Sequence, residues 1–219
     1  MTQHFRREVE RLKKKILSLC AFVEESVHKS VKSVEERDEK LARSVIETDL
    51  EIDQMEVELE EECLKVLALY QPVAIDLRFI VAVLKINNDL ERIADEAANI
   101  AERSLYLSKK PKVNLPIDLP GMAEKVKAML DKSLNSLVEM DTDLARLVCK
   151  SDDEIDDINR QIFSKVQQRI KSEPDQIEAL IHLLSVSRYL ERIADHATNI
   201  AEDVIYMVEG VITRHSAKS

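Results

Sequence analysis

Apolar residues recur at spacings of three and four along most of the chain, a pattern typical of amphipathic helices. In a first helix, predicted over residues 3–36, the pattern consists of Val9, Leu12, Ile16, Leu19, Val23, Val27 and Val31. A second helix is predicted over 38–69, where Asp38 is a suitable N-cap residue. Pro72 suits the first turn of a third helix over 73–108. Short links between long helices favour antiparallel neighbours, so this region predicts a three-helix bundle.

The same plan repeats after a break. Residues 109–121 contain three prolines and one glycine, a composition that indicates a linker. Beyond it, the pattern predicts helices over 122–140, 142–172 and 174–212. We therefore expect an all-α fold of six long helices in two tandem three-helix bundles. Its parts are a first repeat over 1–108, a linker over 109–121 and a second repeat over 122–219.

An internal repeat supports this division. Residues 90–102 read LERIADEAANIAE and residues 190–202 read LERIADHATNIAE, so that only Glu96/His196 and Ala98/Thr198 differ. The similarity extends backwards, where Glu51-Ile52-Asp53 matches Glu154-Ile155-Asp156. Self-similarity of this kind indicates that one structural unit occurs twice.

Pairs of acidic residues recur at corresponding places in the two repeats. In the third helix of each repeat, the pairs are Glu91/Asp95 and Glu191/Asp195, four residues apart and therefore on one helix face. Asn99, Asn199 and Glu202 continue these stripes. The second helix of each repeat carries Asp49/Asp53 and Asp152/Asp156. A hairpin between the second and third helices brings the pairs level, so the sequence predicts four facing carboxylates in each repeat.

Like charges at such spacing destabilise a helix, so raised pKa values, arginine partners or a bound cation must offset them. Arg92 and Arg192 adjoin the acids in sequence but project about 100° away around the helix, which makes them doubtful partners. Oxygen ligands favour Mg²⁺, Mn²⁺, Ca²⁺ or iron and disfavour structural zinc. We expect divalent or iron-type ions (Fe, Mn, Mg or Zn) without assigning one. A solvated acidic face is the alternative.

Composition narrows the function further. The formal net charge of −10 argues against nucleic-acid binding. The basic N-terminal stretch, Arg6-Arg7 and Lys13-Lys14-Lys15, predicts a solvated helix face or a contact with an anionic membrane surface. The three cysteines, Cys20, Cys63 and Cys149, lie in apolar helical patterns and indicate buried free thiols in a reducing compartment. The longest apolar run, Phe79–Leu84, is too short for a membrane span, and no signal peptide is recognisable, so we expect a cytoplasmic protein.

The segment Gln71-Pro72-Val73-Ala74-Ile75-Asp76-Leu77-Arg78 and the two LERIAD…NIAE segments resemble the PhoU family over nearly the whole chain. The resemblance implies two three-helix bundles related by an approximate two-fold, with multinuclear metal sites built from E(D)xxxD motifs. The matching motifs here are Asp49/Asp53, Glu91/Asp95, Asp152/Asp156 and Glu191/Asp195. It also implies a regulator without enzymatic activity that dampens phosphate-starvation genes and links a phosphate ABC transporter to a membrane sensor histidine kinase. A homodimer is left open.

Two departures from the repeat stand out. The second repeat has Glu173-Pro174-Asp175-Gln176-Ile177-Glu178 where the first has QPVAIDLR, so it lacks the arginine. His196 replaces Glu96, and we interpret it as a surface or packing histidine.

Three other functions compete with the regulatory one. A di-metal carboxylate oxidase would need a Glu-x-x-His motif on each of two helices, but Glu25/His28 has no counterpart in the second repeat. His28 could also mark a histidine phosphotransfer module. A structural bundle with solvated acidic faces would show no dependence on metal.

Overall fold

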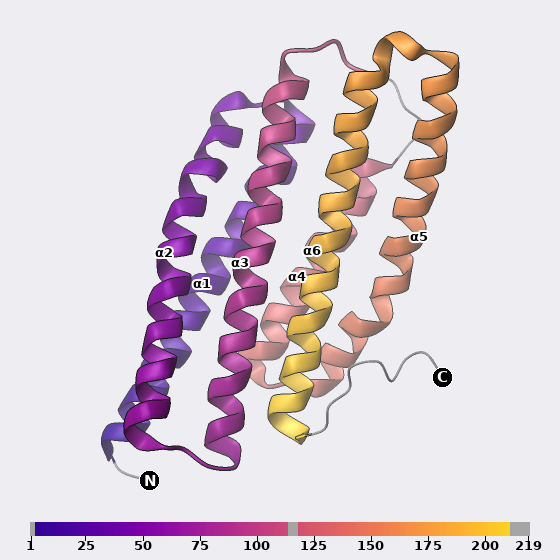
Figure 1. Cartoon of the computed structure of the whole chain (residues 1–219). Helices are drawn as coiled ribbons and strands as arrows, with labels where there is room; N and C mark the ends of the chain where they lie inside the picture. The colour runs from indigo at the N-terminus through magenta and orange to yellow at the C-terminus, as the bar shows by residue number, and fades with distance from the viewer. Residues whose placement is uncertain (1–2, 114–117, 211–219) are drawn as a thin grey trace.

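The computed structural model describes residues 3–113 and 118–210, which form six α-helices and one short 3₁₀ turn (Figure 1). The elements are α1 (Gln3–Glu36), α2 (Glu39–Tyr70), α3 (Ile75–Ser108), α4 (Leu119–Glu139), α5 (Thr142–Ser172), η1 (Pro174–Gln176) and α6 (Ile177–Glu209). The described part of the chain contains no strand, and the predicted all-α fold is confirmed.

Capping residues explain several helix ends. Asp38 accepts hydrogen bonds from the Lys40 and Leu41 amides at the start of α2, as predicted, and Asp141 does the same for α5. The predicted start of α3 at residue 73 is wrong by two positions, because Ala74 has a φ of +52° and interrupts the helix. The start of α4 is also earlier than predicted, since Asp118 caps it through the Gly121 amide. The end of the predicted linker is thus helical, while residues 114–117 lie outside the described residues.

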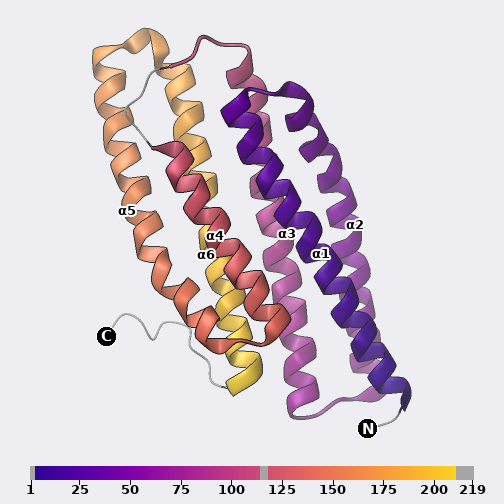
Figure 2. The same cartoon turned by 180° about the vertical axis from the view of Figure 1, so that it is seen from behind.

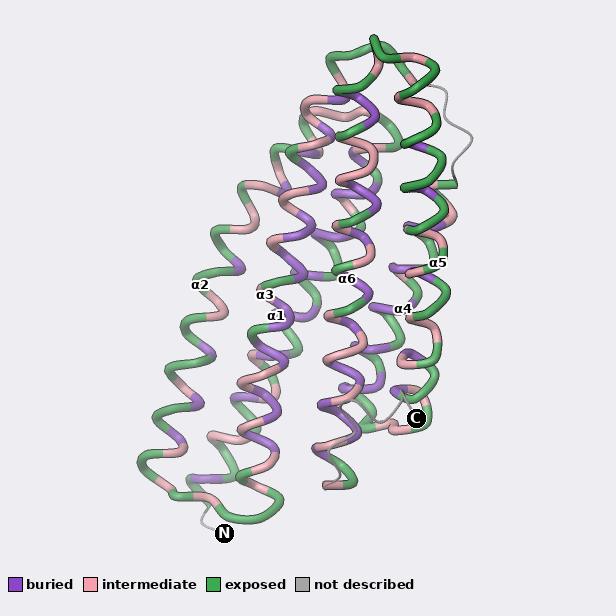
Figure 3. Tube along the Cα trace, turned by 45° about the vertical axis from the view of Figure 1, so that its right-hand side comes forward, coloured by how far each residue is buried: buried purple, intermediate pink, exposed green. Residues whose placement is uncertain are grey.

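The two repeats share one core. Helices α3 and α6 lie side by side in the middle, with α1 and α2 on one side and α4 and α5 on the other (Figures 1 and 2). Buried apolar side chains from all six helices form a single continuous cluster. Their inward faces are visible along each helix in Figure 3. Alanines at the centre, including Ala94, Ala97, Ala194 and Ala197, are almost completely buried and allow α3 and α6 to approach closely.

An ion pair and a ring stack join α3 to α6 at two points along their length. Lys85 contacts Asp203 at 3.1 Å, and the rings of Tyr106 and His182 stack with centroids 3.8 Å apart. As residue numbers rise along α3 they fall along α6, so the two helices are antiparallel. In this register Ala94 lies level with Ala194, the equivalent residue of the second repeat. The approximate two-fold axis therefore passes through the centre of the α3–α6 pair.

The thiols behave largely as predicted. Cys20 and Cys63 are buried and free, and burial raises the pKa of each to about 12. Cys149 is free but only half-buried. Among the described helices, none combines the length and apolar character required to cross a membrane.

Candidate metal sites

The α2–α3 hairpin brings two acidic pairs together in the first repeat. We call Asp49, Asp53, Glu91 and Asp95 the first cluster. Burial raises the pKa of Asp49 to about 6, with further contributions from the charges of Asp53 and Asp95. One carboxylate oxygen of Asp49, Oδ1, is buried and has no hydrogen-bond partner among the described residues. Burial and then Asp95 raise the pKa of Glu91, and the charge of Asp53 on α2 adds to this shift. The α2 and α3 acids are therefore within electrostatic reach of each other, as the hairpin geometry predicted.

The α5–α6 hairpin builds the same arrangement in the second repeat. We call Asp152, Asp156, Glu191 and Asp195 the second cluster. Burial, followed by the charges of Glu191, Asp152 and Asp156, raises the pKa of Asp195 to about 6. Burial and then Asp156 raise the pKa of Asp152, while a hydrogen bond from the Thr198 hydroxyl at 3.4 Å opposes this shift.

The carboxylate pKa values are raised first by burial and then by neighbouring carboxylates, so lost hydration and repulsion both oppose ionisation in the two clusters. A hard cation would relieve both the repulsion and the loss of hydration, so the all-oxygen donor sets suit such an ion chemically. The side chains are spread out, however. Within residues 3–113 and 118–210, no three His, Cys, Asp or Glu side chains are gathered closely enough to hold one metal ion. Binding would therefore require rotation of these side chains.

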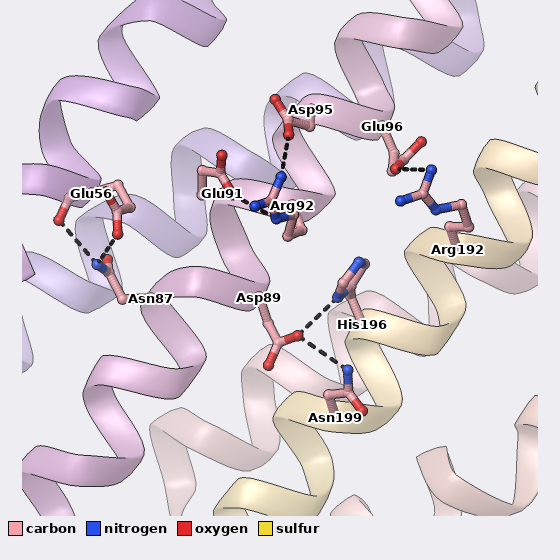
Figure 4. A network of polar contacts seen from close by, with 10 residues as sticks. All are labelled: Glu56, Asn87, Asp89, Glu91, Arg92, Asp95, Glu96, Arg192, His196 and Asn199. Atoms are coloured by element: carbon pink, nitrogen blue, oxygen red, sulfur yellow. Dashed lines mark hydrogen bonds and ion pairs between the residues drawn. The ribbon is translucent and has the colours of Figure 1, made fainter.

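The first cluster carries its own arginine. Nε of Arg92 lies 3.3 Å from Glu91 Oε2, and Nη1 lies 3.2 Å from Asp95 Oδ2 (Figure 4). The prediction that Arg92 is a doubtful partner is therefore wrong. Its Cα–Cβ bond does point away from the acids, but the long side chain folds back along the helix surface to reach them.

The second repeat uses its arginine differently. Arg192 crosses to α3 and contacts Glu96, with Nη1 2.9 Å from Oε1 (Figure 4). The Glu96 side chain is only 3% exposed. Burial raises the pKa of Glu96, and Arg192 is the largest influence that lowers it. The repeated motif thus places one arginine beside its own acids and the other across the interface.

The two asparagines of the predicted stripes also face the α3–α6 interface. Asn199 donates from Nδ2 to Asp89 Oδ1 at 3.1 Å, and His196 Nδ1 lies 2.8 Å from the same oxygen (Figure 4). The amide of Asn99 lowers the pKa of Glu96, which places it beside that carboxylate. In the orientation seen here, neither amide belongs to the acid cluster of its own repeat. Burial raises the pKa of Cys149 and the charge of Glu202 adds to this shift, so Glu202 lies beside α5.

His196 is partly buried, with a side chain 19% exposed, and its contact with Asp89 fits the packing alternative of the prediction. Sequence reasoning missed the residues that it and Arg192 contact. Asp89 precedes the repeated segment and matches Tyr189, so the repeat did not single it out. Glu96 was noted only as a difference between the repeats. One feature of the sequence could have identified them: Asp89 and Glu96 are both acids on α3, and polar residues of α6 lie opposite them.

Comparisons with known proteins agree with this fold. The PhoU domain family model matches residues 16–104 and 119–204. The chain is 39% identical to the phosphate-specific transport system accessory protein PhoU homolog of Aquifex aeolicus, over 95% of each chain. It is 38% identical to PhoU homolog 1 of Thermotoga maritima, over 94% of this chain and 90% of that one. The crystal structure of PhoU from Pseudomonas aeruginosa is 34% identical, with a TM-score of 0.91, over 94% of this chain and all of that chain.

Proposed function

This chain belongs to the PhoU family of phosphate-transport accessory and regulatory proteins, and from this premise we propose that it is a metal-binding regulatory adaptor of phosphate uptake. It bridges a phosphate ABC transporter and a membrane sensor histidine kinase, and it dampens the phosphate-starvation response when phosphate is plentiful. It works by binding partners and has no catalytic step of its own.

One observation above all supports the metal-binding part. Four carboxylates face each other across a helix hairpin in each repeat, and the pKa values of Asp49 and Asp195 are both raised to about 6. An ordinary solvated acidic face would not show this shift, because water would screen the charges. The same four-carboxylate arrangement occurs in both repeats. Each cluster therefore carries negative charge that a cation would neutralise.

In this proposal, the carboxylates of the first cluster, on α2 and α3, would hold one ion, and those of the second cluster, on α5 and α6, would hold another. A bound cation supplies positive charge that joins two neighbouring helices. The protein's own groups determine the rest: Arg92 competes with the cation for Glu91 and Asp95, whereas Arg192 is held by Glu96. The outer faces of the helices remain free for partners.

Thermal unfolding of chelator-stripped protein tests the metal sites. An ion at about 100 times its dissociation constant stabilises the folded state by about 2.7 kcal/mol per site. For a protein of this size, this corresponds to a rise in Tm of roughly 5–10 °C. We expect such a rise with at least one of Mg²⁺, Mn²⁺, Fe²⁺ and Zn²⁺, and a smaller one in Glu91→Ala/Asp95→Ala and in Glu191→Ala/Asp195→Ala. The matched control is Glu47→Ala/Glu51→Ala, an acid pair of equal spacing on the exposed face of α2.

No rise with any ion, or an equal rise in every variant, would leave the clusters as structural acids. The same samples test the alternative function of a di-metal oxidase. If the protein had that function, its iron-loaded form would consume oxygen. The regulatory part is tested in cells whose own copy is deleted. We expect high expression of a phosphate-starvation reporter at ample phosphate, and restoration of low expression by this chain. Failure to repress, with normal protein levels, would contradict the adaptor role.

A further inference from the structure

The two hairpin turns lie at opposite ends of the molecule and differ in chemistry. The α2–α3 turn lies at the end that carries the start of α1, whereas the α5–α6 turn lies at the other end (Figures 1 and 2). Three acids, Glu173, Asp175 and Glu178, surround the α5–α6 turn. We call the other end, formed by residues 3–15 of α1 and residues 65–79, the basic tip.

Four large apolar side chains project into solvent at the basic tip. The exposed fractions are 66% for Leu69, 73% for Val73, 69% for Ile75 and 41% for Leu77. Single exposed apolar residues are ordinary, but several in one short turn indicate an interaction site. These four contribute little to the core, so the fold alone gives no reason for their apolar character.

The basic tip is held in a defined shape. Gln71 and Ala74 both have positive φ values, 46° and 52°, which turn the chain sharply between α2 and α3. The rings of Phe5 and Tyr70 pack with centroids 5.5 Å apart, so the first turn of α1 is fixed beside the apolar turn. Apolar and basic side chains from distant parts of the sequence therefore share one surface.

The basic side chains come mainly from α1. Residues 3–15 contain six Arg or Lys and only two Glu, in a chain whose formal net charge is −10. Arg11, Lys13 and Lys15 form ion pairs with glutamates. Arg6, Arg7 and Lys14 are exposed and have no ion-pair partner within the described residues. These three basic groups of α1, together with the exposed Lys65 of α2, are thus available to an external anion.

We propose that the basic tip is a docking surface for an anionic lipid bilayer. Val73, Ile75 and their apolar neighbours enter the boundary between headgroups and acyl chains, and Arg6, Arg7 and Lys14 contact the anionic headgroups. A bilayer fits these residues because exposed apolar side chains flanked by exposed basic ones match its apolar interior and its anionic headgroups. The negative charge elsewhere orients the molecule, since other surfaces are repelled by the same membrane.

The expected size of the effect follows from these residues. Each basic residue near an anionic membrane surface contributes about a fivefold change in partition coefficient. Reversing two of them should therefore weaken binding at least about 25-fold. Replacing two apolar side chains that partly enter the bilayer should weaken it by on the order of tenfold.

The experiment is co-sedimentation of the full chain with vesicles of phosphatidylcholine alone or with phosphatidylglycerol, at low and at physiological salt. The test variants are Arg6→Glu/Arg7→Glu and Val73→Ser/Ile75→Ser. The matched controls are Lys40→Glu/Arg43→Glu, with the same charge change at the far end of α2, and Leu50→Ser/Leu64→Ser, on the exposed flank of α2. Because the substituted side chains are exposed, all variants should keep the wild-type Tm.

We expect binding to anionic vesicles only, weakened by salt and by both test variants but not by the controls. Lack of binding at low salt would overturn the proposal, as would equal binding by all variants. Concentration-dependent self-association that both test variants abolish, without vesicle binding, would instead assign the tip to the acidic α5–α6 turn of a second copy. Since the vesicles contain no protein, any of these results leaves the adaptor role untouched.

Discussion

The two acid clusters are built on almost the same sequence, yet their arginines make different contacts. In the first cluster, Arg92 contacts Glu91 and Asp95 of its own helix. In the second, Arg192 makes its ion pair with Glu96 on α3, although its charge still opposes the rise that burial causes in the pKa of Glu191. The acids are equivalent by repeat, but the positive charge that accompanies them is not. Equivalent motifs in a repeat can therefore make different contacts because different residues face them.

The cause is the residue across the interface. In the antiparallel register of α3 and α6, Arg192 lies level with Glu96, and Arg92 lies level with His196. Glu96 has a buried carboxylate that pairs with Arg192, whereas His196, which faces Arg92, is already in contact with Asp89. Arg92 consequently returns to its own helix. The difference between Glu96 and His196 thus accounts for the different contacts of Arg92 and Arg192. In the second cluster, the charge of Arg188 opposes the rise that burial causes in the pKa of Glu191 more than that of Arg192 does.

The largest expected effect is the difference in unfolding free energy between the two arginine-to-alanine variants. Arg192→Ala leaves the buried Glu96 carboxylate without its ion-pair partner, and we expect a loss of about 2 kcal/mol in unfolding free energy, reduced from the fully buried case because Arg192 is half exposed. Arg92→Ala removes a pair that water screens well, and we expect a loss of less than about 0.5 kcal/mol. Urea denaturation of metal-free protein at pH 7.5 measures both. Equal losses would contradict the comparison.

A smaller effect is expected from pH, and here the two clusters should agree. Burial and nearby carboxylates raise the pKa of Asp49 and Asp195 to about 6 in the folded state, against about 3.9 in the unfolded chain. The folded state therefore binds more protons, and ionisation of these groups destabilises it as pH rises from about 4 to 7.

Asp49→Asn and Asp195→Asn remove this charge. In metal-free protein, each should stabilise the fold by about 1 kcal/mol at pH 7, a value discounted for partial exposure, with the gain vanishing toward pH 4. Urea midpoints at pH 7, 6, 5 and 4 give the test. A gain that does not change with pH would show that the raised pKa values are not its source.

The smallest effect concerns cation affinity. Arg92 competes with a cation for Glu91 and Asp95, so Arg92→Gln should raise the affinity of the first cluster by roughly two- to fivefold. Calorimetric titration in a Glu191→Ala/Asp195→Ala background isolates this cluster. Arg192→Gln, measured on the second cluster in a Glu91→Ala/Asp95→Ala background, should change affinity less because Glu96 already engages that arginine. A larger change in affinity for Arg192→Gln than for Arg92→Gln would mean that the arginines do not cause the difference in cation affinity between the clusters.

Much of the fold could be predicted because the signals were local and repeated. The spacing of apolar residues gave the helices, and Asp38 as an N-cap gave a helix start. Errors occurred where a single residue decided the outcome, as at Ala74, whose positive φ delays α3. The acid pairs were also predictable, since spacing of four fixes a helix face and a short turn fixes which helices face each other.

The partners of those acids were not predictable in the same way. Cβ direction argued against Arg92, but a long flexible side chain can fold back to a nearby carboxylate. Asn99 and Asn199 follow the acidic stripe in sequence, yet the interface with the other repeat draws Asn199 to Asp89. Such contacts depend on the register of two helices about 100 residues apart in sequence, and no local pattern specifies that register.

The sequence by itself determined the six helices, the two repeats and the facing carboxylates, because these follow from periodicity, turns and residue type within one hairpin. Only the tertiary structure decided the α3–α6 register, the exchange of Arg192 to Glu96, and the union of the N-terminal basic residues with the apolar turn at one tip. The physical reason is that charge pairs and surfaces form between whichever side chains packing brings together, and packing of the two repeats is settled by the shared core.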